Sequence, residues 1–86
     1  MTEKQFSVDA ARKITANEIY GRIKTRDGHP VRIICWKAKS IKPIVALVDF
    51  GAYEQVCMYT KDGKFDVREN VTSNFDLIIE TEGGEA

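Results

Sequence analysis

The stretch PVRIICWKAKSIKPIVALVDF, Pro30 to Phe50, decides the fold of this chain. It contains two apolar runs, Val31 to Trp36 and Ile44 to Val48, which are separated by the basic connector Lys37 to Lys42. Each run is rich in β-branched residues and shorter than a typical helix. Each also follows a proline, which suits the start of a strand but not a helix interior. The stretch therefore predicts the central hairpin of a small antiparallel β domain.

The flanking turns extend this pattern in both directions. Thr25 to Gly28 reads TRDG and lies between an Ile19 to Thr25 strand pattern and the first apolar run, and Thr60 to Gly63 reads TKDG after a Tyr53 to Tyr59 strand pattern. An Asp-Gly pair between two strand patterns is a strong hairpin signal, because Asp tolerates the positive φ angles of such turns and Gly adopts them freely. The sequence thus predicts two hairpins built with the same turn chemistry.

The N-terminal part predicts a short helix over about residues 7–16. Val8, Ala11 and Ile14 recur at spacings of three, Ser7 is a natural N-cap, and Asp9 lies in the first turn. Phe6 could pack back on the helix as a hydrophobic staple, and Asn17 ends the helix. A helix of two to three turns is too short to be stable alone, so it must pack on the sheet or cover one open end of it.

Five or six short strands with tight turns and one helix predict a mainly β fold, a small antiparallel SH3-like barrel. A two-layer α+β arrangement is the alternative. The last strand is expected at Phe75 to Glu80, and the Asp66 to Asn74 segment before it has no clear pattern. We expect a single domain over residues 1–80 and a flexible acidic tail over 81–86.

The composition, 86 residues with 43% apolar and 30% charged, is that of an ordinary globular protein. The polar start of the chain shows no signal peptide, and no apolar run is long enough to cross a bilayer, so we expect a cytoplasmic protein without membrane contact. Cys35 and Cys57 lie in apolar segments without CxxC spacing. We expect them to be buried free thiols rather than a disulfide or metal ligands.

The net charge is zero but unevenly distributed. Residues 22–42 carry seven cations and one acid, a net charge of plus six, whereas residues 49–86 carry three cations and nine acids, a net charge of minus six. This asymmetry could mark a basic surface for an anionic partner. The simpler interpretation, which we favour, is that strands from the two halves pair and neutralise one another.

Two kinds of binding function fit the sequence. Small barrels bind single-stranded nucleic acid with a basic groove and exposed aromatic residues. The residues that could form such a surface are Tyr20, Arg22, Lys24, Arg32, Trp36, Lys37, Lys39 and Lys42. Trp36 could equally lie in the core, and a pI near neutrality is atypical of nucleic-acid binders.

The preferred hypothesis is a non-catalytic protein-interaction module with a protein partner or a second copy of itself. Several strands carry apolar residues on both faces, and a barrel interior can take only one of them. The chain has no nucleophile elbow, phosphate loop, HExxH or dinucleotide fingerprint, and its single histidine, His29, lies beside a turn. We therefore expect neither catalysis nor a cofactor nor a metal site.

Several short motifs also resemble a family of short, uncharacterised proteins from bacteria and from phage or prophage regions. They are Thr25 to Gly28, Arg32 to Cys35, Pro43 to Val48, Glu54 with Val56, Tyr59 to Lys64, and Asp76 with Leu77. The resemblance implies a shared fold and an accessory role in a mobile element or its host. It implies no activity and no site residues.

Overall fold

The computed structural model describes residues 2–68 and 71–81. Within these ranges the chain forms six strands and one helix. Their order is β1 (Thr2–Gln5), α1 (Val8–Thr15), β2 (Gly21–Thr25), β3 (Val31–Cys35), β4 (Ile44–Asp49), β5 (Glu54–Tyr59) and β6 (Leu77–Thr81). The expected mainly β architecture with a short N-terminal helix is confirmed.

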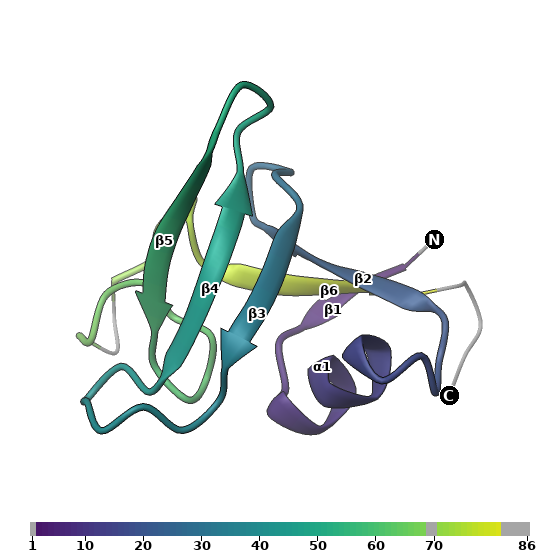
Figure 1. Ribbon diagram of the computed structural model, residues 1–86, viewed down its shortest axis with the longest axis horizontal. Helices are drawn as coiled ribbons and strands as arrows, with labels where there is room; N and C mark the ends of the chain where they lie inside the picture. The colour runs from purple at the N-terminus through teal and green to yellow at the C-terminus, as the bar shows by residue number, and fades with distance from the viewer. Residues whose placement is uncertain (1, 69–70, 82–86) are drawn as a thin grey trace.

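The strands form two open antiparallel sheets of three strands each, in the orders β1-β6-β2 and β3-β4-β5. The strands of the first sheet run across those of the second, and α1 lies below the first sheet beside the end of β3 (Figure 1). β2 meets β3 at a bridge between Lys24 and Pro30. The topology therefore contains the predicted central hairpin, β3-β4, but shows no closure into a barrel.

The core lies between the two sheets and is completed by α1. Its members are apolar residues from five of the strands, from the helix and from the segment before it: Phe6, Ala11, Ile23, Ile33, Ile44, Ala46, Tyr59, Leu77 and Ile79. On β4 the buried residues alternate with half-buried ones, as a period of two requires. One face of each sheet is therefore buried against the other sheet and the helix.

The ends of α1 follow the prediction. The Ser7 hydroxyl accepts a hydrogen bond from the Ala10 N–H at 3.1 Å, and Asn17 adopts a φ of 61° just after the last turn. The Glu18 N–H then donates to the Lys13 carbonyl at 2.8 Å, which closes the C-terminus of the helix. Phe6 is a core residue and not only a hydrophobic staple for the helix. It is 6% exposed, and its ring packs against Gly63 of the Thr60 to Gly63 turn.

The two Asp-Gly turns share one hydrogen-bond pattern. In each turn the glycine N–H donates to the threonine carbonyl at 2.9 Å, and the threonine hydroxyl accepts the N–H of the residue that follows the glycine. Only the glycines, Gly28 and Gly63, have positive φ, so the aspartates do not need the left-handed conformation that the sequence led us to expect. The turns are three-residue loops with a glycine in the left-handed region.

The N-terminal strand was not predicted. β1, with the sequence TEKQ, pairs with β6 from Thr2↔Thr81 to Gln5↔Ile78 and makes β6 the central strand of its sheet. This segment has no alternation of apolar residues from which a strand could be predicted. It forms a strand because its backbone pairs with the buried strand β6. The strand expected from Phe75 begins at Leu77 and extends to Thr81. The flexible tail predicted over 81–86 is therefore wrong at Thr81, which is a buried residue of β6, and its remainder lies outside the described residues.

The start of β6 is held by Asp76, which is 2% exposed. Its carboxylate accepts the N–H of Phe65 at 2.8 Å and the N–H of Ser73 at 3.0 Å, and its carbonyl accepts the Arg26 N–H at 2.8 Å. A buried carboxylate is tolerated where several donors satisfy it. Asp76 therefore joins β6 to both Asp-Gly turns, since Arg26 belongs to the first turn and Phe65 follows the second.

Alanine substitution should reduce the stability of the protein by different amounts at the two turn glycines, Gly28 and Gly63. A Cβ on Gly63 would lie 2.6 Å from ring carbons of Phe6, whereas a Cβ on Gly28 would meet nothing within 4 Å. Gly28→Ala should cost only the left-handed strain, about 1–2 kcal/mol, and Gly63→Ala should cost about 1–3 kcal/mol more from overpacking. Urea unfolding of both variants measures the difference, and equal losses of stability would show that Phe6 does not pack on Gly63.

Candidate interaction surfaces

The structure distributes the residues of the predicted nucleic-acid surface among separate places. Arg22 and Lys24 lie on β2, in the first sheet, and Arg32 lies on β3, in the second. Trp36 lies just after β3, and the three lysines Lys37, Lys39 and Lys42 lie in the connector between β3 and β4. The candidate residues therefore lie on elements of both sheets and in one connecting loop.

Three cations of the sheets, Arg22, Lys24 and Arg32, are paired with carboxylates. Glu80 and Glu54 belong to the acidic half of the chain, and Glu3 belongs to the N-terminal stretch before residue 22. Glu80 on β6 lies 3.2 Å from both Arg22 and Lys24, and Lys24 also lies 3.0 Å from Glu3 on β1. The hydrogen bonds that the Lys24 ammonium donates to Glu3 and Glu80 raise the pKa of Lys24. On the second sheet, Arg32 contacts Glu54 at 3.0 Å. The prediction that the two halves neutralise each other across strands is confirmed for these pairs.

The two predicted aromatic residues have different environments. Trp36 is half-buried, packs against the core, and has the Arg12 guanidinium 5.6 Å from its ring centre. Tyr20 is 85% exposed and lies in the loop before β2, beside the helix. Trp36 thus serves mainly as a packing residue.

The outward faces of the two sheets differ in chemistry. On the first sheet the outward rows, such as Glu3, Glu80 and Arg22, carry the ion pairs described above. On the second sheet the register places apolar side chains outward on all three strands, namely Ile34, Cys35, Val45, Leu47, Val56 and Met58. We call these six residues the apolar face.

The apolar face is open to solvent in part. Val56 and Ile34 are 59% and 53% exposed, and the other four members are half-buried by their neighbours. Of the charged residues on the same side of the sheet, Asp49 and Glu54 lie at the end where β4 turns into β5, whereas Arg32 lies opposite Leu47, in one row with Leu47 and Val56. The helix contacts β2 rather than this side. The sequence pattern of two-sided apolar strands is thus explained by a core face and a second, uncovered face.

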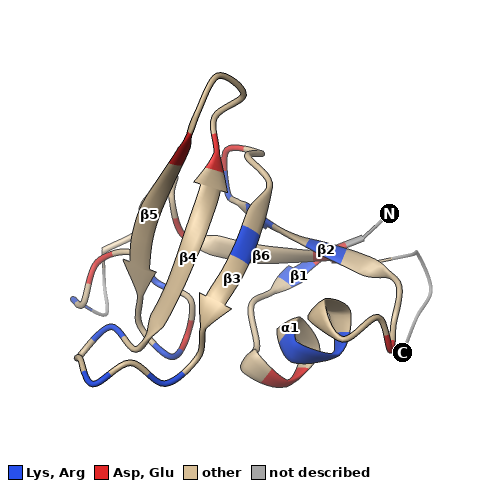
Figure 2. Ribbon diagram, in the orientation of Figure 1, with Lys and Arg blue, Asp and Glu red and all other residues tan. Residues whose placement is uncertain are grey.

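A further group of cations lies at the opposite end of the second sheet. The connector before β4 and the loop after β5 meet there, because β4 starts at the end where its antiparallel neighbour β5 stops. Lysine and arginine residues of these two segments gather below β3 and β4 (Figure 2). We call this group the basic end; its members are Lys37, Lys39, Lys42, Lys61, Lys64 and Arg68.

Half of the basic end was missed by sequence analysis. Lys61, Lys64 and Arg68 belong to the acidic half of the chain, whose net charge concealed them. They line a hollow of about 640 Å³ together with Ser40 and Ile41 of the connector. The predicted antiparallel pairing of β4 with β5 could have shown that the connector before β4 and the loop after β5 lie at the same end of the sheet.

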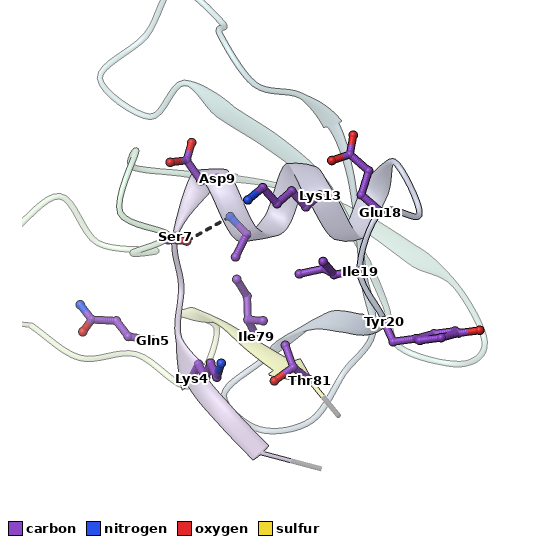
Figure 3. Close-up of a pocket in the computed structure, with 11 residues that line it drawn as sticks. Lys4, Gln5, Ser7, Asp9, Lys13, Glu18, Ile19, Tyr20, Ile79 and Thr81 are labelled. Carbon is purple, nitrogen blue, oxygen red and sulfur yellow. Dashed lines mark hydrogen bonds between the residues drawn. The ribbon is translucent and has the colours of Figure 1, made fainter. Parts of the chain in front are cut away.

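A second hollow, of about 590 Å³, lies between α1 and the first sheet. Ile79 and Ile19 point into it, whereas the Tyr20 ring points away (Figure 3). Its lining combines the cations Lys4 and Lys13 with the acids Asp9 and Glu18. Thr81 also lines the hollow, and its buried hydroxyl has no hydrogen-bond partner among the described residues.

The side chains with potential chemical reactivity, namely those of His29, Cys35, Cys57 and Tyr59, are held in turns or partly buried by their neighbours. His29 Nδ1 lies 2.9 Å from Asp27 in the first turn, and the His29 ring packs 4.6 Å from Phe50. Cys35 and Cys57 are both free and half-buried. Burial raises the pKa of the Cys57 thiol and that of the Tyr59 phenol, so both groups are protonated at neutral pH. Within residues 2–68 and 71–81, no group of three potential metal ligands comes together.

Comparisons with known proteins bring no further assignment. No protein-family model, curated protein or solved structure matches this chain. In the described part of the chain, no helix is long and apolar enough to cross a membrane.

Substitution of Glu80 should reveal the ion pairs of the first sheet. Glu80→Gln removes the carboxylate shared by Arg22 and Lys24, so we expect a lower melting temperature, with a smaller deficit at high salt because screening already weakens the pairs. Glu54→Gln, which removes an exposed partner of Arg32 alone, is the matched control and should have a smaller effect. An unchanged melting temperature in Glu80→Gln at low salt would show that the pairs contribute nothing.

Proposed function

We propose that this protein is a non-catalytic interaction module that associates with a second copy of itself through the apolar face. The observation that carries this proposal is the row of outward apolar side chains on β3, β4 and β5, with Val56 and Ile34 more than half exposed. Monomeric proteins rarely expose contiguous apolar patches, and such patches commonly mark interfaces.

A second copy suits this face for a simple electrostatic reason. The charged residue in the rows of the apolar face, Arg32 opposite Leu47, is paired with Glu54 at 3.0 Å, so two copies could meet there without burying an unpaired charge. Across a twofold axis the same apolar patch is presented by both subunits, which requires no other complementary surface. A different protein partner remains the alternative occupant.

The size of the face sets the expected affinity. Three strands about 4.8 Å apart and six residues long form a face of roughly 14 by 20 Å. Two such faces cover roughly 560 Å², well below the roughly 1,200 Å² at which standard specific interfaces begin. We therefore expect a weak dimer, with a dissociation constant on the order of 10–100 µM.

Three finer expectations accompany this proposal. A cytoplasmic location agrees with an apolar face flanked by free thiols. An SH3-like barrel agrees with two crossed three-stranded sheets that meet at Lys24 and Pro30. An accessory role in a mobile element rests on the resemblance to short bacterial and phage-region proteins alone.

Sedimentation equilibrium over a range of protein concentrations tests the dimer. The wild-type chain should show concentration-dependent association, and Val56→Lys should weaken it by about a hundredfold or more, because an ammonium group would be buried without a partner. The melting temperature of Val56→Lys should stay close to that of the wild-type monomer, since residue 56 is 59% exposed there.

Ile41→Lys provides a matched control. Ile41 is 76% exposed in the connector and lies outside the apolar face, and the substitution adds the same charge. Association should persist in this variant. A wild-type chain that is monomeric at every concentration, or a Val56→Lys variant that associates as tightly as wild type, contradicts the proposal.

A further inference from the structure

The outer side of β5 has no strand beside it among the described residues. β5 ends the order β3-β4-β5, and Figure 1 shows it as the outermost strand of that sheet. Its register with β4 runs without a shift from Glu54 to Tyr59. Glu54, Gln55 and Val56 are all exposed, although Gln55 faces the side of the sheet opposite to the other two. The first half of β5 is therefore uncovered on both sides.

The hydrogen bonds of the β4-β5 hairpin show which backbone groups of β5 are free. The Phe50 N–H donates to the Tyr53 carbonyl at 2.9 Å, so these two residues form a hydrogen-bonded pair. Along an antiparallel ladder such pairs alternate with pairs that are not bonded to each other. From Tyr53 onward, Glu54, Val56 and Met58 therefore direct their N–H and C=O groups away from β4. Among the described residues, no backbone hydrogen bond reaches these groups.

β5 lacks the features that keep most sheet edges from pairing. Natural edge strands are commonly short, or they carry Lys, Pro or a bulge. β1, at one edge of the first sheet, is four residues long and contains Glu3 and Lys4. β5 is six residues long and has no Lys, Pro or bulge, and its one charged residue, Glu54, is already paired with Arg32 at 3.0 Å. β5 is therefore the edge that is suited to accept another strand.

We propose that β5 pairs antiparallel with β5 of a second copy, across a twofold axis at Val56. In this register Val56 lies opposite the partner's Val56, and Glu54 lies opposite the partner's Met58. All three residues with free backbone groups then form hydrogen-bonded pairs, each with two hydrogen bonds. A shift of the register by two residues in either direction would leave one of these pairs unmade.

Closure and charge favour a second copy of β5 over β1 as the occupant of this edge. Twofold pairing consumes the β5 edge of both copies, whereas pairing of β5 with β1 of the next copy would leave a free edge at each end and continue into a filament. In the twofold register the two Glu54 carboxylates do not face each other, so no like charges are opposed across the strands.

The area of the apolar face favours the same occupant. Antiparallel pairing of the two edges places both apolar faces on one side of a continuous sheet. Two such sheets stacked face to face would cover roughly 1,100 Å², close to the roughly 1,200 Å² at which standard specific interfaces begin. Edge pairing does not require the contact between apolar faces, but it would strengthen that contact.

Amide hydrogen exchange, followed residue by residue by NMR in dilute and in concentrated solution, tests edge pairing. The amides of Glu54, Val56 and Met58 should exchange at least about tenfold more slowly in the concentrated sample, because they donate only in the paired state. The amides of Gln55 and Cys57 already donate to β4 and should be slow in both samples.

Val56→Pro removes the two central hydrogen bonds of the paired edges. The ladder to β4 should survive, because the N–H of residue 56 points outward and proline is tolerated at such edge positions. Slow exchange at Gln55 and Cys57 verifies that β5 still pairs with β4. The concentration dependence at Glu54 and Met58 should disappear. If this variant does not fold, the wild-type concentration series still decides the proposal.

Ile34→Lys is the control that separates the edge from the apolar face. Ile34 is 53% exposed on β3, so the substitution charges the apolar face and leaves β5 unchanged. Protection at Glu54, Val56 and Met58 should persist in this variant, whether or not the apolar faces associate. Exchange of these amides that does not depend on concentration in the wild type would overturn the proposal. An equal loss of protection in Ile34→Lys and Val56→Pro would also overturn it, because the shielding would then belong to the apolar face.

Discussion

The carboxylate of Asp76 is the contact on which the arrangement of the two sheets depends. It is buried, accepts two backbone N–H groups from the segment between β5 and β6, and lies where β6 enters the centre of the first sheet. The Asp76 carbonyl in turn accepts the Arg26 N–H of the first turn. One residue thus ties the start of β6 to the two segments in which the chain passes between the sheets, the turn from β2 to β3 and the segment from β5 to β6. An 86-residue chain with a modest core relies on such satisfied polar contacts as well as on apolar burial.

This arrangement separates three kinds of surface. The first sheet turns a row of paired charges outward, and the second turns apolar side chains outward. The loops at one end of the second sheet carry the lysines. Paired charges at a protein surface contribute little to partner binding because the partner must compete with the existing pair. The apolar face therefore carries the proposed function.

Much of the fold could be predicted from local patterns, and most of what could not depends on pairing across the chain. The Asp-Gly turns, the Ser7 cap and the β-branched runs specify their elements by short-range chemistry, so the helix and five of the strands lie close to their predicted positions. β1 has no such pattern and exists because β6 offers it a partner edge. The positions of the individual charges on the surface could not be predicted from sequence blocks for the same reason. Arg22 and Glu80 are distant in sequence but adjacent in the sheet, whereas Lys39 and Lys61 are brought to one end by the antiparallel order of β4 and β5.

The central claim is that the uncovered side of β3-β4-β5 is where this molecule meets its partner, a second copy of the chain. Amide chemical shifts recorded over a protein dilution series test it most directly. The account predicts concentration-dependent shifts for amides of β3, β4 and β5, around Ile34, Leu47 and Val56, with the first sheet unchanged. Spectra that do not change with concentration, or changes confined to β1, β2 and β6, would contradict it.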